Sequence, residues 1–263
     1  MDLRLAGNIV LVTGGSKGIG FACARVLSAE GAHVILSSRS ADNLERAAEQ
    51  IRKETGREPG TVVADVSLAD DIRALGSYVS GRYERLDGLL INAGGPPLGA
   101  SLEHDDAAWY KALDTQLMSG VRLAREFVPL MRKNRYGRIV AITSTGVKQA
   151  LAGLVLSNAA RMGLAGFLKT LATEVAADQV YINTLMPGPT DTERLRDILE
   201  KNARAQNKSV GEVVRERISQ VPAGKFGDPD DLAALAAFLL SPRNNFITAQ
   251  AIAVDGGYLK GNL

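Results

Sequence analysis

The residues best suited to bind a ligand form a glycine-rich segment near the amino end of the chain. Thr13-Gly14-Gly15-Ser16-Lys17-Gly18-Ile19-Gly20 follows the apolar run 9–12 and precedes a helical pattern. Glycines permit a tight turn and close approach to a pyrophosphate, and the amino end of a helix offers N–H donors and a positive dipole. The alternative is a tight strand-to-helix connection that binds nothing. The strand before the turn and the helix after it favour a nucleotide site.

The charges near this turn indicate which dinucleotide would bind. In dinucleotide folds, an acid at the end of the second strand holds the ribose 2′-hydroxyl, whereas an arginine accommodates a 2′-phosphate. The second apolar run ends in Ser37-Ser38-Arg39-Ser40, and no acid follows before Asp42. Lys17 adds a cation within the turn. We therefore expect NADP(H) in preference to NAD(H), the alternative being that Arg39 is a solvated loop residue.

The elements that must position these residues follow from the hydrophobic pattern. Short apolar runs rich in β-branched residues cover residues 9–12, 34–36, 61–64, 89–91, 139–142, 181–185 and 251–254. Helical patterns between them cover residues 21–30, 41–55, 68–80, 107–134, 154–177 and 229–240. Continuous apolar runs are typical of strands covered on both faces, and this alternation predicts right-handed βαβ units. We expect one α/β domain over residues 1–263 with a doubly wound, Rossmann-like parallel sheet.

The segment 191–221 interrupts this regular alternation. It is charged and helical in composition, and it is longer than a simple crossover between two strands requires. An insertion at the carboxyl edge of a parallel sheet is a candidate lid over a substrate. We expect residues 191–221 to cover the pocket.

Composition excludes several classes of protein. The 263 residues carry a net charge of +2, with 46% hydrophobic and 23% charged residues, which is typical of a globular domain. No basic surface for nucleic acid and no membrane-spanning apolar run is present in the sequence. The one cysteine, Cys23, is expected to be a small buried apolar residue. With a single cysteine no intramolecular disulfide can form, which is consistent with a reducing compartment such as the cytoplasm. His33 and His104 have no partners at metal-ligand spacing, so we expect no metal site.

Further motifs, each placed after an expected strand, give the chain a family resemblance. These motifs are Thr13-Gly14-x-x-x-Gly18-x-Gly20, Asp65-Val66, Asn92-Ala93-Gly94, Pro187-Gly188 and Val254-Asp255-Gly256-Gly257. From about residue 5 to residue 258, the chain resembles the short-chain dehydrogenase/reductase family, and its β-ketoacyl-carrier-protein-reductase-like branch in particular. The resemblance implies an oxidoreductase acting on a small carbonyl or alcohol substrate. It also implies a homo-oligomer, a tetramer built on the two long helices.

The same resemblance assigns residues to the cofactor. Those implied are Gly14, Ser16, Lys17, Gly18, Ile19, Gly20, Ser38, Arg39, Asp65, Val66, Asn92, Ala93, Gly94, Pro187, Gly188, Thr190 and Thr192. Asp65 would accept a hydrogen bond from the adenine amino group, and residues 187–192 would border the nicotinamide. Structural alternatives remain open: Asp65 could cap a helix, Asn92 could tie two strands together, and Pro187-Gly188 could form only a turn.

The catalytic positions depart from the family pattern. The family places a Tyr-x-x-x-Lys pair on the long helix after the fifth strand, a serine at the end of that strand, and an asparagine on the preceding long helix. Ser144 matches the serine, but no tyrosine occurs between Gly137 and Val180. Aligning Ser157-Asn158-Ala159-Ala160 with the family's Ser-Lys-Ala-Ala places Leu154 at the tyrosine position and Asn158 at the lysine position. Gln116 then occupies the asparagine position.

Three functional hypotheses remain open. The protein could transfer a hydride with its proton supplied by Ser144, Thr145, water or the substrate, since the nicotinamide performs the hardest step. It could instead be a cofactor-binding sensor or an oligomeric partner without turnover. In the third hypothesis another cation substitutes, because Leu154, Asn158 and Arg161 share one helix face, although a solvated or interface Arg161 is the simpler interpretation. Lys148 could bind an anionic substrate, but we expect it to be solvated.

Overall fold

A seven-stranded parallel sheet forms the centre of the molecule. The structure is a computed structural model and describes residues 2–261. The strands are β1 (Ile9–Thr13), β2 (His33–Ser38), β3 (Gly60–Val63), β4 (Gly88–Ile91), β5 (Gly137–Ile142), β6 (Val180–Pro187) and β7 (Ala251–Val254). They lie in the order β3-β2-β1-β4-β5-β6-β7, which is doubly wound and confirms the expected fold class. The order reverses between β1 and β4, where such sheets bind ligands at their carboxyl ends.

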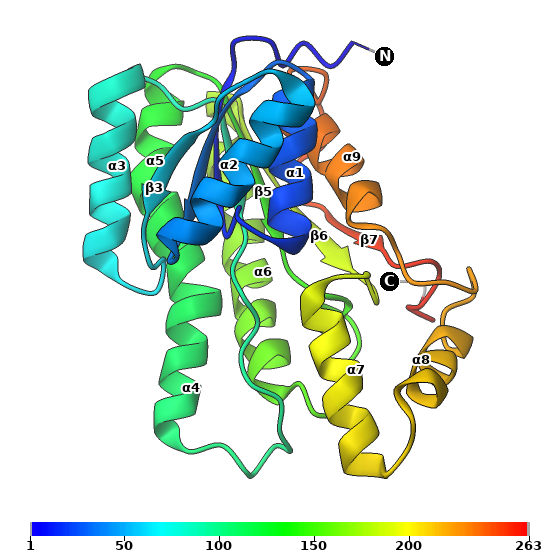
Figure 1. Cartoon of the computed structure of the whole chain (residues 1–263). Helices are drawn as coiled ribbons and strands as arrows, with labels where there is room; N and C mark the ends of the chain where they lie inside the picture. Colours follow the sequence, from blue (N-terminus) through cyan, green and yellow to red (C-terminus); the bar gives the residue numbers. More distant parts are fainter. Residues whose placement is uncertain (1, 262–263) are drawn as a thin grey trace.

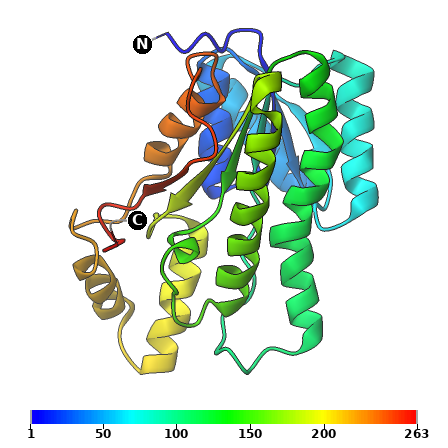
Figure 2. The ribbon, with the colours of Figure 1, turned by 180° about the vertical axis from the view of Figure 1, so that it is seen from behind.

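Helices cover both faces of this sheet (Figures 1 and 2). The α-helices are α1 (Gly18–Ala29), α2 (Ala41–Thr55), α3 (Ala69–Tyr83), α4 (Asp106–Leu113), α5 (Ser119–Lys133), α6 (Val155–Val175), α7 (Glu193–Gln206), α8 (Val210–Ser219) and α9 (Pro229–Leu240). One face carries α1, α2 and α9, and the other carries α3, α5 and α6. No helix of residues 2–261 is long and apolar enough to cross a membrane.

Alternation along the strands explains the two layers. In β1, Val10 and Val12 pack in the core beneath α1 and α9, whereas Ile9 and Leu11 pack in the opposite core beneath α3 and α5. Successive strand side chains point to opposite faces, so a strand covered on both sides must be apolar throughout. All residues of β1, β4 and β5 are buried, as the continuous apolar runs predicted. The edge strand β3 instead alternates between partly buried and exposed residues.

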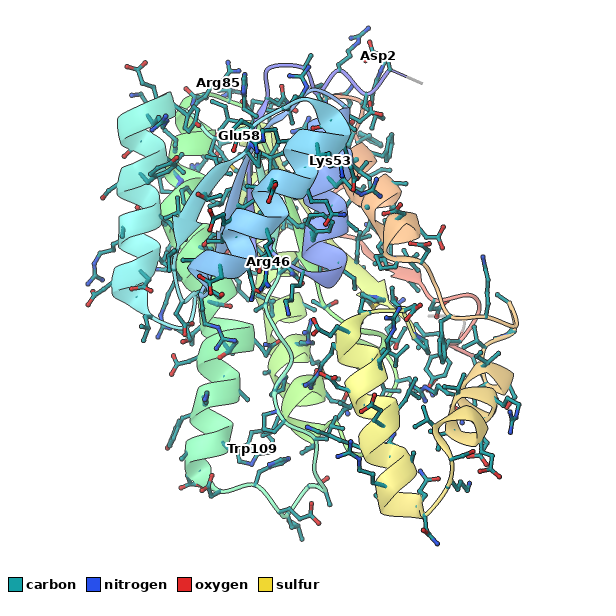
Figure 3. The ribbon with its side chains drawn as sticks, in the orientation of Figure 1. Asp2, Arg46, Lys53, Glu58, Arg85 and Trp109 are labelled. Atoms are coloured by element: carbon teal, nitrogen blue, oxygen red, sulfur yellow. The ribbon has the colours of Figure 1, made fainter. Side chains whose placement is uncertain are left out.

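Two segments differ from the simplest expectation. The pattern over residues 107–134 is not one helix, because a π-helical turn over Asp114–Met118 separates α4 from α5. The insertion 191–221 forms α7 and α8, which pack through a small core of their own that includes Leu199, Ala203 and Val213. Charged side chains such as Arg46 and Lys53 on α2 project from the outer layer, and Trp109 lies on α4 at the far end of the molecule (Figure 3).

Candidate active site

The glycine-rich turn is packed so tightly that three of its glycines, Gly14, Gly15 and Gly20, admit no side chain. A Cβ atom on Gly20 would lie 2.2 Å from the Gly14 carbonyl oxygen, and one on Gly14 would lie 2.8 Å from Asn92. Gly14 also has a φ of +56°, in the left-handed region. The Asn92 Nδ2 donates to the Gly14 carbonyl at 3.1 Å, which joins the turn to the end of β4. Asn92 therefore does tie two strands together, while it also lines the cavity described below.

The first turn of α1 leaves its backbone N–H groups available to a ligand. Within residues 2–261, no side chain caps this helix, whose N-cap is Lys17 in extended conformation, and its first turn contains no acid. Uncapped N–H groups at a helix amino end form an anion site when they face a cavity. The Lys17 Nζ lies 3.0 Å from the Glu193 carboxylate at the start of α7, so this ion pair links the glycine turn to the inserted helices.

One large cavity, of about 1890 Å³, runs along the carboxyl edge of the sheet. Its lining includes every cofactor-binding residue expected from the sequence except Gly20, which is buried under the turn: Gly14, Ser16, Lys17, Gly18, Ile19, Ser38, Arg39, Asp65, Val66, Asn92, Ala93, Gly94, Pro187, Gly188, Thr190 and Thr192. Ser144 and the first helix of the 191–221 insertion line the same cavity. The fold thus brings together motifs that lie up to about 180 residues apart in the chain.

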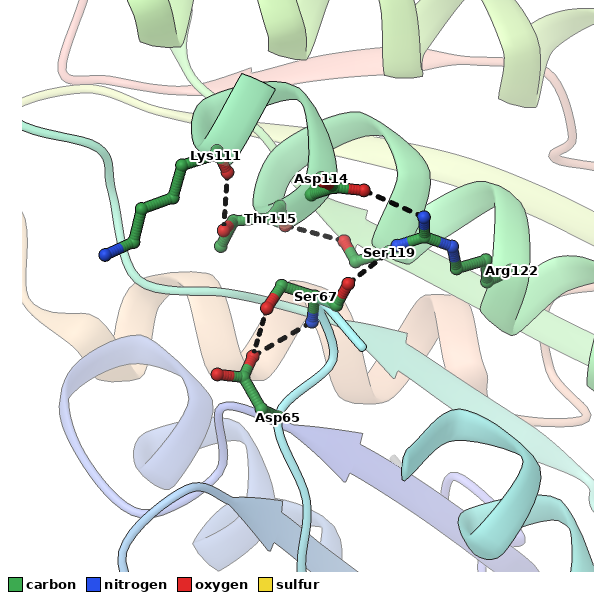
Figure 4. A network of polar contacts seen from close by, with 7 residues as sticks. All are labelled: Asp65, Ser67, Lys111, Asp114, Thr115, Ser119 and Arg122. Atoms are coloured by element: carbon green, nitrogen blue, oxygen red, sulfur yellow. Dashed lines mark hydrogen bonds and ion pairs between the residues drawn. The ribbon is translucent and has the colours of Figure 1, made fainter. Parts of the chain in front are cut away.

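Arg39 and Asp65 face each other at the end of the cavity away from Ser144. The Arg39 side chain is 71% exposed, and its Nη1 lies 3.9 Å from the Asp65 carboxylate, so its charge is accessible to a ligand. Asp65 accepts hydrogen bonds from the Ser67 backbone N–H at 2.9 Å and from its hydroxyl at 2.7 Å (Figure 4). Arg122 donates to the Ser67 carbonyl and pairs with Asp114, so the network connects Asp65 to the π-helical turn.

Three polar side chains line the cavity at the end of β5. Ser144 follows β5, and its Oγ accepts from the Gly146 N–H at 3.0 Å. Ser157 and Arg161 lie one helical turn apart on α6 and both line the cavity. Arg161 Nη1 donates to the carbonyls of Ile142 and Thr143 at 2.8 and 2.6 Å, which fixes the guanidinium next to the end of β5.

The Arg161 guanidinium is not fully satisfied by the protein. Its Nε is buried and has no hydrogen-bond partner within the part of the chain that the structure describes. Burial, assisted by the nearby positive charge of Arg194, lowers the pKa of Arg161 to about 10. Arg161 therefore remains a cation at neutral pH, and its Nε–H is left without an acceptor among the described residues.

Asn158 does not occupy the place that the sequence alignment predicted for it. Its Nδ2 donates to the Leu151 carbonyl at 2.8 Å, and its side chain packs beside Gly146 instead of lining the cavity. Leu154 does line the cavity, as the N-cap of α6. The pair with one-turn spacing on the cavity wall is therefore Ser157 and Arg161, and not Leu154 and Asn158. The signal was present in the sequence, since Ser157 and Arg161 have the same four-residue spacing.

Gln116 lies in the π-helical turn, behind the cavity wall. It is buried, and its Nε2 donates at 2.6 Å to the carbonyl of Gly94, the last residue of the Asn92-Ala93-Gly94 motif. π-helical turns are rare and occur often at functional sites. Gln116 thus braces the loop that follows β4.

The remaining candidates lie outside this site. Cys23 is fully buried, and burial raises the pKa of its thiol to about 12, so it packs as an apolar residue, as expected. Lys148 is exposed and does not line the cavity. Among residues 2–261, no three His, Cys, Asp or Glu side chains are grouped as a metal site would require.

Comparison with known proteins places this architecture in a family. The family model described as enoyl-(acyl carrier protein) reductase matches residues 14–259. The 3-oxoacyl-[acyl-carrier-protein] reductase FabG of Vibrio cholerae is 32% identical over 255 residues, covering 97% of this chain and 98% of the relative. The chain belongs to the short-chain dehydrogenase/reductase family.

Solved structures of this family have the same shape. L-sorbose reductase from Gluconobacter frateurii, complexed with NADPH and L-sorbose, is 31% identical with a TM-score of 0.94, covering 99% of this chain and 100% of that one. Actinorhodin polyketide ketoreductase with NADPH is 32% identical with a TM-score of 0.92, covering 96% and 97%. The resemblance seen in the sequence motifs is therefore confirmed at the level of the short-chain dehydrogenase/reductase family, its ketoacyl-reductase-like members included.

Proposed function

We propose that this short-chain dehydrogenase/reductase uses NADP(H) to interconvert a small carbonyl compound and its alcohol in the cavity beside Ser144. The observation that carries the proposal is that one cavity contains the uncapped amino end of α1, Arg39 and the Ser144–Ser157–Arg161 group. Two of the similar solved structures were determined with NADPH, which supports the choice of cofactor.

The residues present fit such a cofactor. The N–H groups of α1 and the close-packed glycines would receive the pyrophosphate, and Arg39 with Ser38 would receive the 2′-phosphate. Asp65, already oriented by Ser67, would accept from the adenine amino group. When bound, the nicotinamide supplies or accepts the hydride.

The side chains of β5 and α6 would hold the substrate oxygen. The hydroxyls of Ser144 and Ser157 donate hydrogen bonds to the carbonyl, and the Arg161 cation stabilises the negative charge that develops on its oxygen during reduction. None of these groups is a strong acid at neutral pH, so water entering the open cavity would deliver the proton through the hydroxyls. Losing a positioned general acid slows such a reaction about 10²–10⁴-fold without preventing it.

A second candidate function is cofactor binding with little or no turnover. It is favoured by the lack of a tyrosine between residues 137 and 180, because a phenol would be the family's proton donor. The one tyrosine that lines the cavity within residues 2–261 is Tyr258, after β7, with Arg217 stacked 4.9 Å from the centre of its ring. Tyr258 comes from the opposite side of the cavity, next to α8.

Anaerobic incubation with NADPH and a panel of ketones and 3-oxoacyl thioesters tests both candidates, with the nicotinamide absorbance as readout. A reductase consumes NADPH with at least one carbonyl compound, Ser144→Ala and Ser157→Ala lower the rate, and Tyr258→Phe leaves it unchanged. NADPH binding without consumption by any compound favours the second candidate. Loss of activity in Tyr258→Phe alone would contradict the roles given to the two serines.

A further inference from the structure

Two arginine residues from different helices line the same cavity, close enough for the charge of Arg194 to act on Arg161. Arg161 enters from α6 and is held by the carbonyls at the end of β5. Arg194 enters from the first turn of α7, and its Nη2 donates to the Pro96 carbonyl at 2.6 Å. That nitrogen lies 3.2 Å from where a Cβ atom on Gly95 would stand, so Arg194 spans from the inserted helix to the loop after β4.

None of the ion pairs formed between residues 2–261 involves Arg161 or Arg194. Of the acids within three residues of Arg194, Glu193 pairs with Lys17 and Asp191 pairs with Arg196, while Asp197 on the same helix forms an ion pair with neither Arg194 nor Arg161. The two guanidinium groups repel each other, which is one of the causes that lower the pKa of Arg161.

A buried charge without a counter-charge is costly in a folded protein, and here that charge is Arg161, whose Nε is buried, whereas Arg194 is exposed. The cost is removed when an anion binds between them, and the planar fork of an arginine matches a carboxylate. The unpartnered, buried Nε of Arg161 is a second, independent sign of a missing acceptor on this wall. The site is therefore built for an anionic group close to Ser144.

The cofactor has other places for its own phosphates. Its pyrophosphate belongs at the uncapped amino end of α1, and its 2′-phosphate belongs at Arg39, at the far end of the cavity. The anion beside Arg161 and Arg194 must then come from the substrate.

We propose that the substrate is an oxo acid, or the matching hydroxy acid, whose carboxylate binds between Arg161 and Arg194 and places the reacting carbonyl at Ser144. This inference rests on the proposed function, because it names the substrate class of the same site. It distinguishes this protein from reductases of thioesters, in which the neighbouring carboxyl carbon carries no charge.

Paired ligands test the inference directly. Each member of a panel of 2-oxo and 3-oxo acids, with aliphatic and aromatic side chains, is compared with its methyl ester on the protein saturated with NADPH. Calorimetry gives the affinity, and the nicotinamide absorbance gives kcat/KM. We expect at least one acid to exceed its ester about tenfold or more in kcat/KM, since charge-assisted hydrogen bonds are the strong ones.

Arg194→Gln should lower the affinity and kcat/KM for that oxo acid about 10- to 100-fold. The values for its methyl ester and the affinity for NADPH should not change. Arg161→Lys keeps the positive charge but loses the planar guanidinium, so it should lower the affinity for the oxo acid by a smaller factor. Arg204→Gln is the matched control, because Arg204 lies on the same helix α7, exposed and paired with Glu200, away from the cavity. Circular dichroism checks that each variant is folded.

The outcomes separate this inference from the proposed function. If the esters match or exceed their acids and Arg194→Gln changes neither, the inference is wrong while the reductase activity stands. If Arg194→Gln lowers the affinity for NADPH and not the affinity for the oxo acid, Arg194 binds a cofactor phosphate and the inference is also wrong. If NADPH does not bind to the unaltered protein, the proposed function fails, and the inference fails with it.

Discussion

A single methyl group added to Gly20 would collide with the backbone of its own turn. The Cβ atom would lie 2.2 Å from the Gly14 carbonyl oxygen, so Gly20→Ala must displace the turn. We expect this variant to lower the free energy of unfolding by about 1–3 kcal/mol and to weaken NADPH binding. Gly81→Ala in α3, where nothing lies within 4 Å, should instead be neutral or stabilise by up to about 1 kcal/mol. Urea unfolding compares the two, and equal losses would contradict the packing described.

Arg39 tests the preference for a phosphorylated cofactor. Arg39→Ala removes an exposed guanidinium and should reduce the affinity for NADPH by about 1.5–3 kcal/mol, while the affinity for NADH stays nearly constant. Arg46→Ala, an exposed arginine on α2 outside the cavity, should change neither affinity. Calorimetric titration measures both nucleotides, and equal affinity of the unaltered protein for NADPH and NADH would refute the assignment.

The register of α6 can be tested by building the family's catalytic pair at two places. Ser157→Tyr with Arg161→Lys puts a phenol and an ammonium on the cavity wall, and the lysine would lower the phenol pKa from its ordinary value of about 10. We expect at least about a tenfold gain in kcat/KM for a neutral ketone, within the range of general acid catalysis. Leu154→Tyr with Asn158→Lys should give no gain, because Asn158 points to the Leu151 carbonyl. A gain only in the second pair would show that Leu154 and Asn158 do occupy the family's tyrosine and lysine positions, as the sequence alignment predicted.

That alignment shows where sequence reasoning ends at the residue scale. Ser157-Asn158-Ala159-Ala160 consists of small residues that fit the family pattern in more than one register, and helical spacing alone does not choose between them. The packing of α6 on β5 and β6 decides which side chains line the cavity. The glycine turn was predictable because Gly20 lies against the Gly14 carbonyl and Gly14 has a positive φ, whereas the close approach of Asn92 to both glycines joins segments far apart in the chain.

Among the elements, the central strands β1, β4 and β5 were predictable because a strand covered on both faces is mostly apolar, and this leaves a clear pattern. The π-helical turn over Asp114–Met118 was not predictable, because it keeps the helical composition and only shifts the hydrogen-bond ladder. The same holds for the contact between Arg194 and the loop after β4, which joins segments about 100 residues apart. Such contacts depend on how α7 lies over the sheet.

The inserted helices α7 and α8 offer a prediction at the scale of elements. They share a small core of their own and contact the glycine turn through the exposed Lys17–Glu193 ion pair, which contributes at most about 1 kcal/mol. We expect residues 191–221 to exchange amide hydrogens rapidly in the free protein and more slowly with NADPH bound. The helix α9, packed on α1, should be protected in both states. Uniform protection of residues 191–221 without ligand would indicate a static element and not a lid.

At the scale of the whole molecule, the long helices leave apolar side chains uncovered. Met162 on α6 is 53% exposed and Tyr110 on α4 is 67% exposed, on the elements where a tetramer was expected. Met162→Glu should therefore reduce the mass found by light scattering, whereas Leu68→Gln, at a residue 54% exposed before α3, should not. A monomeric unaltered protein would exclude the tetramer.

The whole-molecule account depends on one event, the passage of a hydride between a bound nicotinamide and a carbon held beside Ser144. The most direct test uses NADPH deuterated at the transferred position, incubated with the oxo acid panel, with the products examined by mass spectrometry. We predict one deuterium on the carbinol carbon of a hydroxy acid, and its loss with Ser144→Ala. Tight binding of NADPH with no deuterium in any product would contradict the account and identify a cofactor-binding protein.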